Sequence, residues 1–174
     1  MQPLRLTAAT LAPHLEALLA ADHRCYPRPV DRLTRERAEL LLAAADLRVR
    51  LWLDVAGEPC GYTAIHTIAA PVLALLQRPP ATAPDRSFVV PAMASEAAAG
   101  VYLFNYSIAA ELRRSGASRA LIAGLADDLG AMAKGLPVAA LCVSDAGIRV
   151  AERLGLRSHA RIEVGGDLET VMLR

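Results

Sequence analysis

Residues 113–118 read Arg-Arg-Ser-Gly-Ala-Ser and connect two segments of different character. The preceding segment, residues 101–108, is Val-Tyr-Leu-Phe-Asn-Tyr-Ser-Ile, which is typical of a strand. The following segment, residues 119–134, has apolar residues at helical spacing: Leu121, Ile122, Leu125, Leu129 and Met132. The first N–H groups of a helix have no partner inside it, and the helix dipole attracts negative charge to them. A basic turn of small residues between a strand and a helix therefore predicts an anion site, such as one for phosphate.

Length and composition indicate one globular domain over residues 1–174. Hydrophobic residues make up 54% of the sequence and charged residues 21%, which argues against a disordered chain. The net charge of +1 gives no reason to expect nucleic acid as a partner. The sequence shows no signal peptide and no apolar run long enough to cross a bilayer. We therefore expect a cytoplasmic protein without a membrane partner.

The cysteines and histidines show no pattern of a disulfide framework or a metal site. Cys25, Cys60 and Cys142 are far apart, form no CxxC pair and are odd in number. The histidines are scattered, without the spacing of zinc ligands. We expect buried or half-buried thiols in a reducing compartment, and no metal.

The remaining periodicities predict strands and helices around one sheet. Strands are expected over residues 4–6, 47–55, 61–68, 101–108, 138–143, 156–164 and 168–173. Helices are expected after an N-cap at Thr10, over residues 32–45 and 119–134, and from a cap at Ser144 or Asp145 to Leu154. Residues 47–55 and 61–68 are expected to form an antiparallel hairpin, as are the last two strands. This order predicts an α/β (α+β) fold with a mixed, mostly antiparallel central sheet and helices on both faces.

Residues 70–100 are the least regular part of the sequence. They contain five prolines, a short leucine cluster at 73–76 and a run of small residues at 92–99. We interpret this Pro/Ala-rich segment as an insertion in the domain. It is expected to form either a flap on the substrate side or a tolerated surface insertion.

Two motifs around the central strand resemble those of the GNAT (Gcn5-related) N-acetyltransferase family, and the resemblance covers nearly the whole chain. That family has an apolar residue at the end of the central strand and, five residues later, the pattern R/Q-x-x-G-x-G/A. Here Ile108 is the apolar residue, and Arg113 and Gly116 fit the first and fourth positions of the pattern. Ser118 stands at the sixth position, where the family has Gly or Ala.

The second motif lies in residues 142–156. The family places a small or polar residue after the next strand, followed by a helix that ends in aromatic-x-x-x-Gly-aromatic. Ser144 stands where Asn is frequent, and Gly155 fits the glycine. Ala151 and Leu156 stand where the family has aromatic residues. Ala151 replaces the tyrosine that usually protonates the departing thiolate.

The resemblance implies a coenzyme A (CoA)-dependent N-acyltransferase, most simply an acetyltransferase that uses acetyl-CoA and a primary amine without a covalent enzyme intermediate. It also implies that a bulge near Ile108 frees a main-chain N–H for the carbonyl oxygen of the donor. An alternative for Arg113 and Arg114 is a solvated position without contact to phosphate. The residues implied in cofactor binding are Ser107, Ile108, Ala109, Arg113, Arg114, Ser115, Gly116, Ala117, Ser118, Arg119 and Ser144.

The catalytic candidates are Tyr102, Tyr106 and His66. Tyr102 stands where some family members have a glutamate base, and Tyr106 shares its strand parity. An unperturbed phenol titrates near ~10 and is a poor base at neutral pH, whereas a histidine on the neighbouring strand has a suitable pKa. Each of the three side chains has an alternative role in packing. Without a tyrosine at Ala151, the thiolate leaves unprotonated or takes its proton from water.

Three further alternatives remain open at this point. The domain could bind CoA or a protein partner without catalysis, since the usual base and acid are both replaced. It could use a longer acyl chain or a carrier-protein donor. A homodimer could form through the final hairpin.

Overall fold

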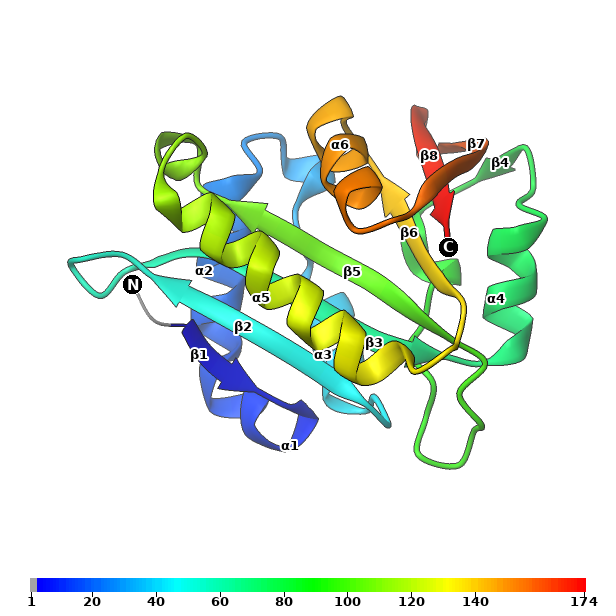
Figure 1. Cartoon of the computed structure of the whole chain (residues 1–174), viewed down its shortest axis with the longest axis horizontal. Coiled ribbons are helices and arrows are strands. Elements are labelled where there is room, and N and C mark those ends of the chain that lie inside the picture. Colours follow the sequence, from blue (N-terminus) through cyan, green and yellow to red (C-terminus); the bar gives the residue numbers. More distant parts are fainter. Residues whose placement is uncertain (1–2) are drawn as a thin grey trace.

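One eight-stranded sheet, in the order β1-β2-β3-β5-β6-β8-β7-β4, organises the chain. The computed structural model describes residues 3–174, so Met1 and Gln2 of the expected domain lie outside the described residues. Figure 1 shows helices on both faces of the sheet. The strands are β1 Pro3–Leu6, β2 Leu47–Leu53, β3 Pro59–Ile68, β4 Thr82–Ala83, β5 Gly100–Ile108, β6 Val138–Cys142, β7 Arg157–Val164 and β8 Asp167–Leu173.

The helices fall between these strands in the expected order. The α-helices are α1 Ala8–Leu11, α2 Leu15–Cys25, α3 Arg35–Leu42, α4 Ala70–Gln77, α5 Gly116–Ala133 and α6 Asp145–Arg153. Short 3₁₀ turns are η1 Ala12–His14, η2 Pro29–Asp31, η3 Arg86–Phe88 and η4 Ala110–Leu112. All neighbouring strands pair antiparallel except β5 with β6 and β4 with β7. The predicted mixed, mostly antiparallel sheet is confirmed.

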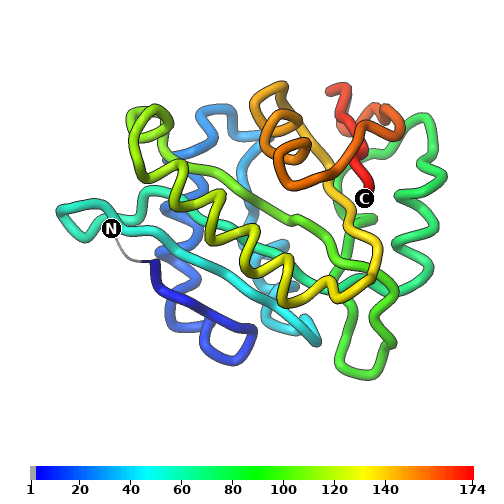
Figure 2. The backbone as a smooth tube through the Cα atoms, viewed as in Figure 1, coloured from blue at the N-terminus to red at the C-terminus, as the bar shows by residue number. Residues whose placement is uncertain are grey.

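Strands β5 and β6 pair over a short length only. Their register covers Val101 with Val138, Tyr102 with Ala139 and Leu103 with Ala140. Beyond this point β6 continues against β8, while β5 continues against β3. Figure 2 shows the two strands moving apart toward the N-terminal ends of α5 and α6. The sheet therefore has an opening between its two middle strands.

Apolar side chains fill both sides of the sheet. On one side, α1, α2 and α3 pack on β1, β2 and β3 through buried residues that include Leu11, Leu18 and Leu41. On the other side, α5 and α6 pack on the central strands through a second cluster that includes Leu125 and Leu129. The period-3.6 leucines read from the sequence are thus the buried faces of these helices.

Three of the expected elements need correction. Thr10 does not cap the first helix: it lies within α1, and its Oγ1 accepts the N–H of Thr7, the residue before that helix. The expected helix over 32–45 is shorter, because Thr34 caps α3 by accepting the N–H of Arg37. The expected helix at 119–134 begins earlier, at Gly116, so part of the basic turn is already helical.

Residues 70–100 are not irregular throughout. Residues 70–77 form α4, whose Val72, Leu73 and Leu76 are buried against the sheet. Pro71 lies in the first turn of this helix, where a missing N–H is tolerated. The sequence analysis named this proline and the leucine cluster behind it only as parts of an irregular segment, so α4 was not predicted.

The final hairpin of β7 and β8 is confirmed around Gly165, which has a φ of +58°. Strand β4 covers Glu163 and Val164 on the outer edge of β7. The homodimer suggested by this hairpin stays a prediction.

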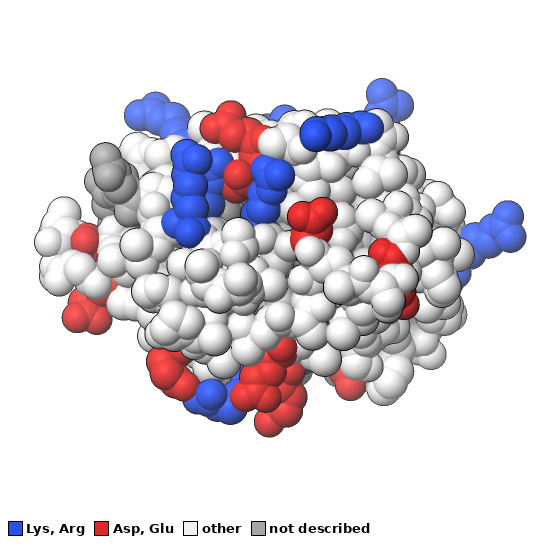
Figure 3. Space-filling view, turned by 90° about the horizontal axis from the view of Figure 1, so that it is seen from below, with Lys and Arg blue, Asp and Glu red and all other residues white. Residues whose placement is uncertain are grey.

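No helix within residues 3–174 has the length and apolar character needed to span a membrane. The face in Figure 3 shows basic and acidic side chains mixed over a mainly uncharged surface.

Gly61 on β3 faces the end of β5 at very short distance. A Cβ atom at this position would lie 2.6 Å from the carbonyl oxygen of Ser107 and 2.9 Å from the Cα of Ile108. Both neighbours are backbone atoms, so a side chain here must displace β5 next to the opening.

We predict that Gly61→Ala lowers the free energy of unfolding by about 1–3 kcal/mol, because the added methyl group overpacks against main chain. Gly130→Ala is the matched control, since nothing lies within 4 Å of its added Cβ and the residue is inside α5. The control is expected to raise stability by about 0.5–1 kcal/mol. Urea denaturation of the two variants measures both effects, and equal stabilities would contradict the close approach at Gly61.

Candidate active site

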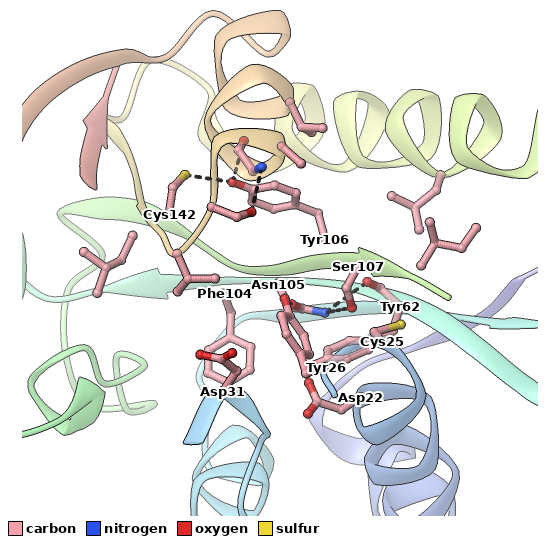
Figure 4. A pocket seen from close by; sticks show the side chains of 18 of the residues that line it. Asp22, Cys25, Tyr26, Asp31, Tyr62, Phe104, Asn105, Tyr106, Ser107 and Cys142 are labelled. Atoms are coloured by element: carbon pink, nitrogen blue, oxygen red, sulfur yellow. Dashed lines mark hydrogen bonds between the residues drawn. The ribbon is translucent and has the colours of Figure 1, made fainter. Parts of the chain in front are cut away.

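A cleft of about 420 Å³ passes through the sheet where β5 and β6 part. Figure 4 shows side chains from α2 and the segment after it below β5, and side chains from β6 and the start of α6 above it. The lining includes Tyr26, Asn105 and Ser107 below, and Tyr106, Cys142 and Gly147 above. A ligand in this cleft can reach groups on both faces of the sheet.

Serine hydroxyls hold the turn that leads into α5. Ser115 is the N-cap: its Oγ accepts the N–H of Ala117 at 3.2 Å and donates to the carbonyl of Leu112 at 2.7 Å. Ser118 donates its hydroxyl to the carbonyl of Arg113 at 2.9 Å. The serines at 115 and 118 therefore stabilise the turn by hydrogen bonds to its own main chain.

Gly116 opens the first turn of α5 onto free space. No atom lies within 4 Å of a Cβ placed on this residue. Close packing of helix on sheet therefore does not explain this glycine, in contrast to Gly124, where the added atom would lie 2.7 Å from the guanidinium of Arg50. The helix start therefore has open space beside Gly116, although the N–H of Ala117 is already bonded to Ser115 Oγ.

Arg113 is not a freely solvated side chain. Its Nε donates to the carbonyl of Ile108 at 3.2 Å, and its Nη2 donates to the carbonyl of Cys25 at 3.3 Å. Cys25 is the last residue of α2, whose carbonyl end attracts positive charge. Arg113 thus ties the end of β5 to the end of α2.

The other residues implied in cofactor binding line the cleft, lie on the adjoining turn or are buried. Ser107, Ile108, Ser118 and Ser144 line the cleft together with Arg113. Arg114, Ser115, Gly116, Ala117 and Arg119 lie on the adjoining turn, outside the cleft lining. Ala109 is fully buried, and its N–H donates to the carbonyl of Cys60 at 2.8 Å, so this N–H is not available to a ligand.

The bulge expected near Ile108 lies elsewhere. Ala64 pairs with Asn105 while Ile65 pairs with Leu103, so Phe104 is the extra residue on β5. Ser107 and Ile108 pair regularly with β3, and the expected position is therefore wrong. The bulge falls directly after the last pair with β6, where the added twist helps the two strands to separate.

A hydrogen-bonded network that the sequence reasoning missed lies below β5. Tyr26 donates its hydroxyl to Asn105 Oδ1 at 2.7 Å, and Asn105 Nδ2 donates to Ser107 Oγ at 2.7 Å. Because Ser107 Oγ accepts this bond, its own proton is free to point to a third group. The available signal was Asn105 itself, a polar residue in an otherwise apolar strand, which is 7% exposed.

Asp22 supports the same wall from α2. Its carboxylate is 2% exposed and accepts the hydroxyl of Tyr62 at 2.8 Å and the N–H of Leu33 at 2.7 Å. Burial raises the pKa of Asp22, and these two hydrogen bonds only partly oppose the effect.

Of the three catalytic candidates, two line the cleft. Tyr106 points toward α6, where its hydroxyl lies 2.9 Å from Cys142 Sγ and donates to the carbonyl of Gly147 at 3.0 Å. Tyr102 is buried and also lines the cleft. Burial raises the pKa of both phenols above the ordinary value.

His66 is the third candidate, and it lies outside the cleft lining. It is fully buried, and its Nδ1–H donates to the carbonyl of Thr67 at 3.0 Å. Desolvation lowers the pKa of His66 to about 4, so its ring is neutral at physiological pH.

Ser144 and Ala151 show how α6 meets the cleft. Ser144 Oγ caps the helix by accepting the N–H of Gly147 at 3.1 Å, as the sequence predicted. Ala151 is fully buried in the cluster between α5 and α6. A tyrosine ring at this position would need new space in the core, so the substitution Ala151→Tyr is not a mild one.

Arg149 and Arg153 on α6 also line the cleft, although the sequence reasoning did not select them. They are four residues apart and therefore share one face of the helix. This spacing was the signal that could have found them. They add positive charge to the α6 side.

We predict that Asp22→Asn makes stability less dependent on pH. A carboxyl whose pKa is raised on folding stabilises the folded state below its unfolded pKa, about 3.9, and this contribution is lost as pH rises through the folded pKa. The stability of the unaltered protein relative to the variant should therefore fall between pH 3 and pH 7, by about 1.4 kcal/mol for each pKa unit of the shift. Denaturant titrations at several pH values measure the difference. A difference that grows with pH would contradict the burial argument.

The chain matches solved structures along its length. The first is the GphF GNAT-like decarboxylase in complex with isobutyryl-CoA, at 17% identity and a TM-score of 0.68, covering 100% of this chain and 98% of that one. An acyl-CoA N-acyltransferase from Pseudomonas aeruginosa has 15% identity and a TM-score of 0.65, with coverages of 99% and 97%. NAA60 from Arabidopsis thaliana in complex with acetyl-CoA has 15% identity and a TM-score of 0.63, with coverages of 99% and 96%.

No protein-family model matches the sequence, and no curated protein matches it significantly. The structural matches nevertheless extend over nearly the whole chain. The protein has the fold of the GNAT acyltransferases.

Proposed function

We propose that the protein is a CoA-dependent N-acyltransferase that transfers an acyl group, most simply acetyl, from acyl-CoA to a primary amine. The observation that carries the proposal is the cleft through the sheet between β5 and β6. One mouth adjoins the open turn at Gly116, and the other is lined by polar groups from α2 and β5. This arrangement fits a long donor that enters from one face and an acceptor that approaches from the other. Solved structures of this fold hold isobutyryl-CoA and acetyl-CoA, which supports the same donor class.

The turn at residues 113–119 is assigned to the diphosphate of the donor. The N–H groups at the start of α5 and the open position at Gly116 suit an anion that approaches main chain closely. Arg113 contributes by holding the turn, since its guanidinium is occupied by two carbonyls. Arg149 and Arg153 supply positive charge from α6.

The chemical step is direct attack on the thioester. The amine nitrogen forms a bond to the carbonyl carbon, the carbon–sulfur bond breaks, and CoA leaves as a thiolate. The carbonyl oxygen becomes negative on the way and needs a hydrogen-bond donor. Main-chain N–H groups of β5 beyond Phe104, which have no partner in β6, and the free proton of Ser107 are suited to this role.

Tyr106 is suited to hydrogen-bond the departing sulfur, but it is a poor acid. Burial raises its pKa well above that of an ordinary thiol, so full proton transfer from the phenol to the thiolate is unfavourable. Neither His66 nor the phenols of the cleft titrate near neutral pH. The amine therefore reacts as its free base and loses its proton to water.

A second candidate is a domain that binds CoA without catalysis. The buried Ala151 in place of a tyrosine and the neutral, remote His66 favour it. Release of free CoA thiol with any amine from a broad panel would exclude it. A panel of acyl donors, with acyl-CoA of different chain lengths and an acylated carrier protein, tests whether a longer acyl group or a carrier-protein donor is preferred.

We predict that Gly116→Glu weakens acetyl-CoA binding by at least about 100-fold. The new carboxylate would face the diphosphate at short range, while a negative charge at the start of α5 is favourable for the helix, so the fold is retained. Gly116→Ala is the control: its methyl group meets no atom within 4 Å, and most of the affinity should remain. Isothermal titration calorimetry measures both. Unchanged affinity in Gly116→Glu would place the diphosphate elsewhere.

We predict that kcat/KM rises with pH through the pKa of the acceptor ammonium group, without a separate ionisation of His66 or of a cleft phenol between about pH 5 and pH 9. The reason is that His66 is already neutral above a pKa of about 4 and the cleft phenols ionise only at high pH. Profiles for two amines of different basicity, followed by thiol release, should be displaced by the difference in the amine pKa values. Profiles with a common inflection near pH 7 would reveal a base on the protein.

A further inference from the structure

We infer that the side of the cleft opposite α5 and α6 binds a carboxylate group through Arg37. This inference rests on the proposed function and specifies the chemistry of its substrates. The carboxylate belongs either to the acceptor, as in an amino acid, or to the acyl group of the donor.

Arg37 reaches the cleft from α3. Its side chain is half-buried and lines the cleft, with Cζ lying 5.7 Å from the centroid of the Phe104 ring. Phe104 is the bulge residue at the point where β5 leaves β6. In the proposed complex the thioester lies beside this point, so Arg37 is within reach of a group a few bonds away from the reacting carbon.

The neighbouring charged groups are already paired. Arg28 forms two hydrogen bonds to Asp31, at 2.7 and 3.0 Å. Arg86 pairs with the buried Glu169 and also lies 3.8 Å from Asp31. These side chains neutralise one another and offer no open charge to a ligand.

Arg37 differs from these side chains. Within residues 3–174, no carboxylate oxygen lies within 4.0 Å of its guanidinium nitrogens. Asp22, Asp85 and Glu169 interact with it only over longer distances. Its Cζ lies over the Phe104 ring, and a contact of this kind does not use the hydrogen-bonding capacity of the guanidinium N–H groups. A planar guanidinium with free N–H groups in a partly dehydrated cleft binds a carboxylate through two parallel hydrogen bonds.

The test compares Arg37→Met with the unaltered protein. Arg35→Met is the matched control, because Arg35 lies on the same helix and pairs with Glu16 and Glu39 outside the cleft. Arg37→Lys keeps the positive charge and loses the two parallel N–H groups of the guanidinium. This variant replaces Arg37→Met in the test if the methionine variant does not fold. Circular dichroism verifies the fold of each variant.

Two arms distinguish the source of the carboxylate. In the first, calorimetry compares succinyl-CoA with butyryl-CoA. In the second, thiol release from acetyl-CoA is measured with amino acids and with the corresponding amino acid amides. We expect a preference for the carboxylate in one arm, and its reduction by about 10- to 100-fold in Arg37→Met but not in Arg35→Met. The preference for the carboxylate in Arg37→Lys should lie between that of the unaltered protein and that of Arg37→Met.

Two results would overturn the inference while leaving the proposed function intact. One is acetyl-CoA binding and turnover with no preference for a carboxylate in either arm. The other is a preference that survives in Arg37→Met, which would leave Arg37 a packing role on Phe104. If the unaltered protein does not bind acetyl-CoA at all, the proposed function fails, and the inference fails with it.

Discussion

The short pairing between β5 and β6 is the constraint on which the site depends. A strand in the middle of a sheet normally satisfies its main-chain groups on both sides, and unpaired groups in a buried place are costly. Here β5 stays paired with β3 and β6 with β8 beyond Leu103, while the two strands no longer pair with each other. The groups left without a strand partner line the cleft, where a ligand or water can satisfy them. The opening starts at the bulge at Phe104, whose added twist helps β5 and β6 to separate.

The sequence predicted the parts of the fold that depend on local periodicity. Alternation and turn residues predicted the hairpin of β2 and β3 and the last hairpin. An apolar run predicted the buried strand β6, and a polar residue before the next helix predicted its cap, which is Ser144. The helix starts and α4 were predicted less accurately, because Thr7 and not Thr10 caps the first helix and the proline-rich segment 70–100 was interpreted as irregular. The bulge was misplaced by four residues, since its position depends on where β5 stops pairing with β6, a strand that lies beyond the whole of α5 in the sequence. That information is not local.

The sequence offered a signal for the turn that is proposed to bind the donor, and none for the opposite wall of the cleft, the proposed acceptor wall. The turn before α5 has a compact signature, because small residues and a glycine are needed within six positions. The acceptor wall is assembled from α2, α3 and β5, and no short motif links Tyr26, Arg37 and Asn105. Adjacent arginines in the turn also could not be told apart from the sequence. Both side chains are exposed, but only Arg113 bonds to two carbonyls, and this follows from the arrangement of α2 beside β5.

The contacts of Arg113 have a mechanical consequence. One guanidinium joins the last carbonyl of β5 to the last carbonyl of α2, and its own backbone begins the turn that is proposed to receive the donor. Asp22 lies on α2, and Tyr26 directly follows that helix. In the proposed complex, a donor that stiffens the turn would act on the α2 side through this one side chain. Reciprocity would then require that a ligand which steadies the α2 side also favours binding of the donor.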